Sequence, residues 1–160
     1  MSDSLGHRRK LCFWGWGYED EALTGDEISH LRGMAQMIGA SGDALATPAL
    51  AEFELPAPRV SSPVGLTHIL SDRPYDRVTH AYGKSFADLV RLQMRQISAP
   101  PDWVAFPKNE DDLSALMDFA AGNGAALVPF GGGTSVCGGV ESDVPGDYEA
   151  VISVDLQYLN

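Results

Sequence analysis

The chain has 160 residues, of which 44% are hydrophobic and 21% charged, a composition typical of a folded globular protein. Its net charge of -11 argues against sequence-independent nucleic-acid binding, which needs a basic surface, but not against a nucleotide cofactor held by backbone amides. Its two cysteines lie far apart, and no apolar run is long enough for a signal peptide or a membrane span. We therefore expect a cytoplasmic protein without disulfides, metal sites or membrane spans.

The N-terminal segment contains aromatic residues interleaved with glycines over residues 13–18. The two-residue spacing predicts an extended arm that places its rings on one side, against a domain that buries them. An arm that covers an active site or a partner subunit is the alternative. The aromatic residues are Phe13, Trp14, Trp16 and Tyr18.

The first helix is predicted over residues 25–38. Thr24 and Glu27 have the spacing of a capping box, and Gly39 and Gly42 follow the helical pattern. Apolar residues recur at helical spacing, and we interpret this stripe as a packing face. Its members are Ile28, Leu31, Met34, Ala35 and Ile38.

Residues 43–84 contain several prolines and are predicted to form a long, irregular linker across a surface. Within it, residues 80–84 are the most suitable to contact a ligand, because they stand directly before a helix. Ser85 and Asp88 predict the capping box of that helix. The predicted apolar stripe consists of Phe86, Leu89, Val90, Met94 and Ile97.

A β-α-β unit is predicted in the C-terminal part of the chain. A strand at 103–106 is followed by a helix beginning at Asn109 or Glu110, and an apolar strand at 125–130 completes the unit. The two strands are expected to be parallel. A final strand is predicted at 150–156. The expected fold class is α+β, with an N-terminal helical extension before a β-α-β-β subdomain.

A glycine-rich loop follows the second predicted strand, from Pro129 to Gly139. Consecutive glycines let backbone N–H groups converge on an anion, and Thr134 and Ser135 add hydroxyl donors. A Walker loop is excluded because no lysine lies in residues 129–160. A Rossmann loop is disfavoured because the glycines follow the second strand and no helical pattern comes next. A glycine-rich bend without a ligand is the alternative.

The segments 100–108 and 127–135 resemble the start of the flavin domain of the vanillyl-alcohol oxidase/p-cresol methylhydroxylase (PCMH-type) superfamily. Within this superfamily the resemblance is to the branch of alkyl-dihydroxyacetonephosphate synthase-like proteins and FAD-linked lactate/glycolate oxidases. Segments 13–21 and 80–85 also resemble the synthase-like members. The resemblance implies an N-terminal region at 1–98 and an incomplete FAD-binding domain at 99–160. It assigns the FAD pyrophosphate to Pro129, Phe130, Gly131, Gly132, Gly133, Thr134, Ser135, Val136, Gly138 and Gly139.

Because the loop contains no histidine for covalent attachment, the resemblance implies non-covalent FAD. It also implies that the chain is part of a longer enzyme, so no catalytic residue is assigned. The substrate expected for that enzyme is a small 2-hydroxy acid, oxidised by the flavin, or a lipid-type substrate of ether-lipid synthesis. Whether the enzyme forms a homodimer is left open. The alternative is a truncated, non-catalytic fragment or interaction module that binds no flavin.

Overall fold

The computed structural model describes residues 9–21, 23–42 and 45–159 and contains a four-stranded mixed sheet. The strands are β1 (Leu70–Ser71), β2 (Trp103–Ala105), β3 (Ala125–Phe130) and β4 (Ala150–Asp155), in the spatial order β1-β2-β4-β3. β2 and β3 are both parallel to β4, and β1 is antiparallel to β2. The predicted parallel β-α-β unit is therefore present, and β4 is inserted between its two strands, β2 and β3.

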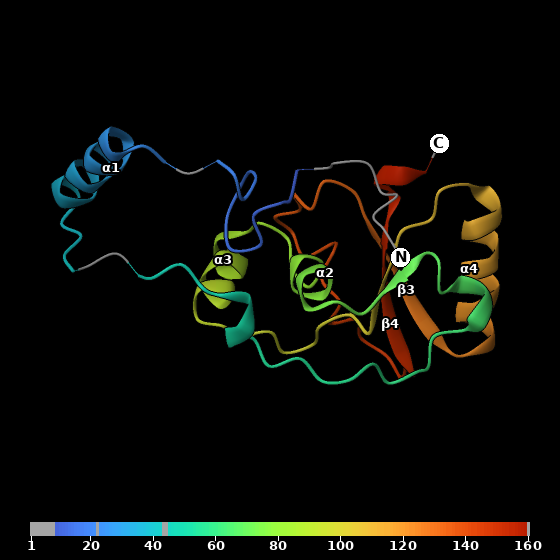
Figure 1. Cartoon of the computed structure of the whole chain (residues 1–160). Coiled ribbons are helices and arrows are strands. Elements are labelled where there is room, and N and C mark those ends of the chain that lie inside the picture. Colours follow the sequence, from blue (N-terminus) through green and yellow to red (C-terminus); the bar gives the residue numbers. More distant parts are fainter. Residues whose placement is uncertain (1–8, 22, 43–44, 160) are drawn as a thin grey trace.

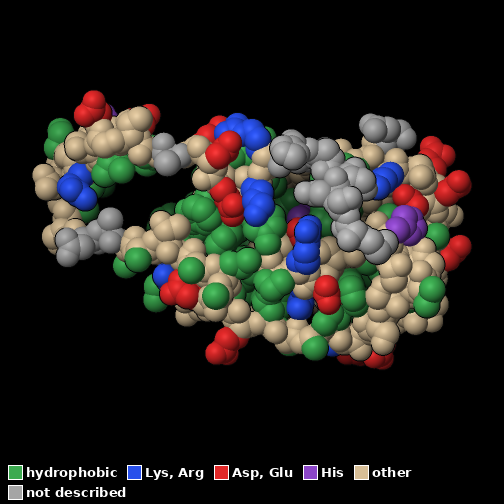
Figure 2. All heavy atoms as spheres, in the orientation of Figure 1, with side chains coloured by type: hydrophobic (Ala, Val, Ile, Leu, Met, Phe, Trp, Pro, Cys, Tyr) green, Lys and Arg blue, Asp and Glu red, His purple; other side chains and the backbone are tan. Residues whose placement is uncertain are grey.

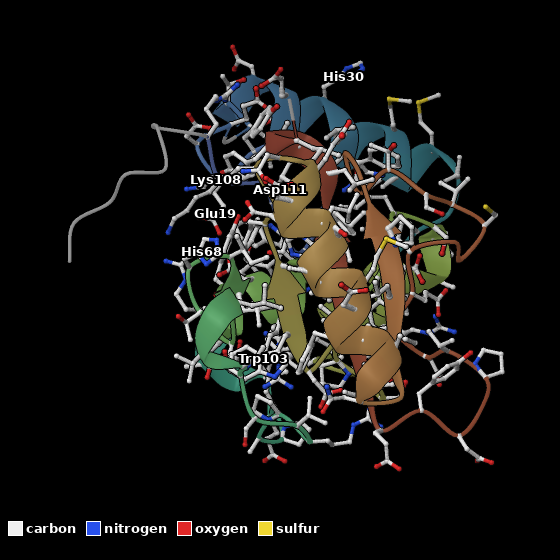
Figure 3. The ribbon with its side chains drawn as sticks, turned by 90° about the vertical axis from the view of Figure 1, so that its right-hand side faces the viewer. Glu19, His30, His68, Trp103, Lys108 and Asp111 are labelled. Atoms are coloured by element: carbon white, nitrogen blue, oxygen red, sulfur yellow. The ribbon has the colours of Figure 1, made fainter. Side chains whose placement is uncertain are left out.

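The sheet is covered on both sides. Helix α4 (Glu110–Gly122) lies on one side of the strands in Figure 1, and α2 (Pro74–Thr79) and α3 (Phe86–Gln93) lie on the other. Figure 3 shows α4 in front of the sheet, with Lys108 and Asp111 at its N-terminal end. Because β4 is central, all of its residues are buried. Its apolar run is thus explained by burial on both faces.

The core consists of two main apolar clusters. One lies between the sheet and α4 and contains the buried residues Leu66, Ile69, Ala105, Leu116, Ile152 and Val154. The other joins α2 and α3 to the N-terminal arm and contains Phe13, Phe53, Val78, Ala81, Tyr82 and Leu92. The second cluster brings together segments that are far apart in the sequence.

The segment 43–84 was predicted to be an irregular linker, and this prediction is wrong in part. Over its described residues it forms two short 3-10 turns, at Leu50–Glu52 and Val64–Leu66, then β1 and α2. Pro74 occupies the first turn of α2, where its fixed φ favours a helix and its missing N–H costs nothing. The prolines therefore do not prevent regular structure here.

Helix α3 has the predicted capping box, in which the Asp88 N–H donates to Ser85 Oγ at 3.1 Å. The predicted apolar stripe is wrong in part, because Phe86, Val90 and Met94 are exposed, whereas Ile97 packs against the second apolar cluster. The buried face is instead formed by Asp88 and Leu92. This face follows from the packing of Leu92 into the second apolar cluster.

The arm is a tight reversal rather than the predicted extended segment. Leu11 and Tyr18 form an antiparallel bridge, and the Cys12 N–H donates to the Gly17 carbonyl at 2.9 Å. Phe13 is buried, whereas Trp16 at the turn is 55% exposed. The glycines thus serve a turn, so the rings do not share one side.

Helix α1 (Gly25–Met37) has the predicted capping box, but none of its residues is buried. It stands apart from the body in Figure 1, and Figure 2 shows hydrophobic side chains on its surface. The predicted packing face is therefore not covered by any described part of this chain. Within the described residues, no helix is long and apolar enough to cross a membrane.

A buried carboxylate joins the linker to the sheet. Asp102 accepts hydrogen bonds from the Arg59 guanidinium at 2.7 Å and from the Val151 N–H of β4 at 2.7 Å. Burial raises the pKa of Asp102, but the bonds from Arg59 and Val151 outweigh burial and lower it overall. Nearby, the buried Arg77 donates to the carbonyls of Pro56 and Pro101.

Replacing Asp102 by asparagine is expected to destabilise the fold by about 2 kcal/mol at neutral pH. The ion pair is lost, and the estimate is modest because Arg59 is half-exposed. Since the pKa of Asp102 is lower in the folded state, its contribution is present above about pH 4 and is lost as the pH falls through the folded value. Urea unfolding from pH 3 to 7 should show the difference shrinking toward acid. The exposed Asp118→Asn variant is the control, and a pH-independent difference would contradict this account.

Candidate functional site

The glycine-rich loop leaves the sheet at the carboxyl end of β3, beside the end of the central strand. Phe130, the last residue of β3, pairs with Asp155, the last residue of β4. Ligands of parallel sheets bind outside the carboxyl ends of the strands. The loop therefore lies at the sheet edge where a ligand is expected.

The loop turns back over the ring of Phe130. Phe130 is 1% exposed, and Gly133 has a φ of +68° above it. A Cβ at Gly133 would stand 2.6 Å from Phe130 Cζ. Only glycine therefore fits at this position, for reasons of backbone conformation and of space.

Gly132 differs from Gly133. It is exposed, and the atom nearest to a Cβ at Gly132 would be Thr134 Cγ2, at 3.9 Å. The protein itself therefore leaves room for a side chain at Gly132. The packing of the chain therefore gives no reason for glycine at position 132, whereas close approach of another molecule to the backbone would.

The backbone N–H groups of the loop are available to a ligand. Within the described part of the chain, no N–H from Gly132 to Val136 donates to a protein acceptor. The Gly139 N–H, in contrast, donates to Ser135 Oγ at 3.2 Å. Successive free N–H groups in a turning backbone form a concavity that suits an anion.

Three residues outside the loop hold its carbonyls and its base. Gln157 Nε2 donates to the Gly131 carbonyl at 2.8 Å, and the Lys84 N–H donates to the Ser135 carbonyl at 2.7 Å. The ring of His80 lies against Phe130, with a centroid separation of 4.1 Å. These contacts hold the start and the middle of the loop in place.

His80 is buried, and both of its ring nitrogens face oxygen acceptors. Nδ1 lies 2.7 Å from the Asp76 carbonyl oxygen, and Nε2 lies 3.3 Å from Asp155 Oδ2. The segment 80–84, singled out for ligand contact, therefore packs against the base and side of the loop. His80 itself supports Phe130.

The loop contains an exposed thiol. Cys137 Sγ lies 3.7 Å from Ser135 Oγ, and both Cys137 and the buried Cys12 are free. The pKa of the Cys137 thiol is lowered mainly by the hydrogen bond with the Ser135 side chain, and to a smaller extent by the backbone N–H of Gly139.

All residues assigned to the cofactor lie in this one loop or at the end of β3. The side chain of Phe130 faces the core, so only its backbone borders the loop surface. The sequence did not reveal the contribution of Gln157 or Asp155. Their contacts cross more than one element, and no local pattern marks them.

Comparison with known families places the C-terminal part in an FAD-binding domain. Residues 101–160 match the family described as "FAD binding domain". The chain is 39% identical over 124 residues to the alkyldihydroxyacetonephosphate synthase of Trypanosoma brucei brucei, covering 71% of this chain and 20% of that protein. It is 29% identical over 91 residues to the synthase of Dictyostelium discoideum, covering 57% of this chain and 15% of that protein.

Solved structures show the same fold. An alkyldihydroxyacetonephosphate synthase structure superposes with a TM-score of 0.78 and 22% identity, over 100% of this chain and 34% of that one. A second has a TM-score of 0.77 and 21% identity, over 95% and 34%. Residues 101–160 thus match an FAD-binding domain, and the chain is similar to alkyldihydroxyacetonephosphate synthases, while spanning between about a seventh and a third of the relatives described here.

Replacing Gly133 by alanine is expected to destabilise the fold, by about 1–2 kcal/mol from the left-handed backbone alone. Contact with the Phe130 ring adds to this. Gly132→Ala is the matched control and should be close to neutral, because its Cβ has room. Urea unfolding of both variants measures the difference. Equal stability of the two variants would contradict the requirement for glycine at position 133.

Proposed function

We propose that the glycine-rich loop binds the pyrophosphate of FAD non-covalently through its backbone N–H groups. The observation that carries the proposal is the run of N–H groups from Gly132 to Val136 that donate to no acceptor in the described residues. The residues proposed to form the site are Pro129, Phe130, Gly131, Gly132, Gly133, Thr134, Ser135, Val136, Gly138 and Gly139.

Backbone amides are a suitable way for this chain to hold an anion. The chain carries a net charge of -11, and residues 129–160 contain no lysine or arginine. Phosphate held here therefore depends on N–H groups pre-arranged by the fold. The buried Phe130 and the left-handed Gly133 provide that arrangement. The absence of histidine from the loop favours non-covalent binding.

We further propose that the whole protein is an FAD-dependent enzyme that acts as an alkyldihydroxyacetonephosphate synthase. The names of the related proteins support this substrate class over a 2-hydroxy acid. FAD would supply the reactive isoalloxazine ring, and the protein would bind and orient it. In this scheme the loop neutralises the pyrophosphate and fixes one end of the cofactor. The boundary at residue 99 and the cytoplasmic location stay predictions.

Gly132→Val, in the protein expressed from its complete coding sequence, should reduce FAD affinity at least tenfold. The new side chain occupies the space through which the phosphates approach the backbone. The flavin absorbance of the purified protein and a titration with FAD measure the effect. Gly65→Val is the control, since a Cβ at Gly65 meets nothing within 4 Å. Unchanged FAD stoichiometry and affinity in Gly132→Val would sink the loop assignment.

The substrate class is tested on the FAD-loaded protein. We expect exchange of the acyl chain of an acyl-dihydroxyacetone phosphate for a fatty alcohol. We also expect no anaerobic bleaching of the flavin by 2-hydroxy acids, because this exchange involves no net redox change. Bleaching without exchange would instead identify a 2-hydroxy-acid dehydrogenase.

A further inference from the structure

Residues Gly83 and Lys84 contact the glycine-rich loop through their backbone. A Cβ at Gly83 would collide with the carbonyl oxygen of Ser135. The next residue, Lys84, donates its backbone N–H to that same oxygen at 2.7 Å. The two backbones therefore lie directly against each other, without intervening side chains.

The side chain of Lys84 extends in another direction, to the N-terminal arm. Its ammonium group donates to the Cys12 carbonyl at 2.8 Å. Cys12 is buried, and a buried carbonyl needs a donor. No carboxylate forms an ion pair with Lys84 among the described residues. Lys84 is half-buried, and burial lowers its pKa.

The hydrogen bond at Ser135 sets the direction of the next N–H group. The Ser135 carbonyl and the Val136 N–H belong to one planar trans peptide, so they point in opposite directions. Because the carbonyl faces Lys84, the Val136 N–H faces away from it. Val136 is 62% exposed, and its N–H donates to no backbone acceptor among the described residues. A shift of residues 83–84 would turn this peptide.

We propose that Lys84 is a positioning residue for the anion-binding loop, an inference that rests on the proposed function of that loop. Its ammonium group, anchored on the Cys12 carbonyl, holds the 83–84 backbone in place. That backbone holds the Ser135–Val136 peptide with its N–H toward the FAD pyrophosphate. The N-terminal arm thereby contributes to flavin binding without touching the flavin.

The test compares variants of the protein expressed from its complete coding sequence. Lys84→Met keeps the length of the side chain and removes the donor, and we expect FAD affinity to fall about tenfold, as for the loss of one charge-assisted hydrogen bond. Lys84→Arg keeps a cationic donor and should restore part of the affinity. Lys108→Met, at the exposed residue before α4, is the matched control and should bind FAD as the unmodified protein does.

A second control separates Lys84 from the arm as a whole. Tyr75 Oη donates to the Leu11 carbonyl at 2.8 Å and so anchors the neighbouring residue of the arm. Tyr75→Phe should change FAD affinity less than twofold, because the bond it removes lies outside the route through Lys84. Equal losses in Tyr75→Phe and Lys84→Met would overturn the specific role of Lys84. Unchanged affinity in Lys84→Met would overturn it as well.

A readout that does not need FAD separates this proposal from the function of the loop. The rate of Cys12 alkylation, followed by mass spectrometry, reports the docking of the arm. Lys84→Met should accelerate it several-fold without FAD, and Lys84→Arg should restore it. If the unmodified protein binds no FAD, the proposed function fails. Unchanged Cys12 alkylation in Lys84→Met would show that the anchor itself is wrong.

Discussion

The geometry of the site depends on the packing of the loop over the ring of Phe130. This ring closes the core at the end of β3, with His80 against it and Gly133 above it. A side chain at Gly133 would have to displace Phe130, which is 1% exposed, so the backbone can follow this course only with glycine at position 133. A core packed at crystal-like density resists such displacement. The direction of the loop amides is thus a consequence of core packing.

The same arrangement accounts for how the proposed anion site would work in an acidic protein. Long-range potential from a net charge of -11 disfavours the approach of a pyrophosphate. The dipoles of the backbone N–H groups act at contact distance. Because the fold holds these groups in place, they do not have to reorient when the anion binds. Rigidity of the loop therefore matters more than its charge. Gln157, Lys84 and His80 supply this rigidity from three different segments.

Local signals predicted the regular elements well and the long-range packing poorly. The capping residues Thr24 and Ser85 marked two helix starts, a third start was predicted at Asn109 or Glu110, and the apolar runs at 125–130 and 150–156 marked two strands. Helix α2 was missed because six residues carry too little periodicity, and its stability comes from burial of Val78 in the second cluster. The face of α1 was misassigned because periodicity shows that a face is apolar, but not what covers it.

The loop was found from its residues because glycine runs have a local meaning. Its supports were not, because Lys84 and Cys12 are 72 residues apart and only the fold brings them together. Hydrogen exchange of the loop amides, measured by mass spectrometry on the whole protein with and without FAD, tests the central claim most directly. We expect FAD to slow exchange in peptides covering residues 132–136 and to leave α1 unchanged. Tight FAD binding with unaltered exchange across 132–136 would contradict the claim.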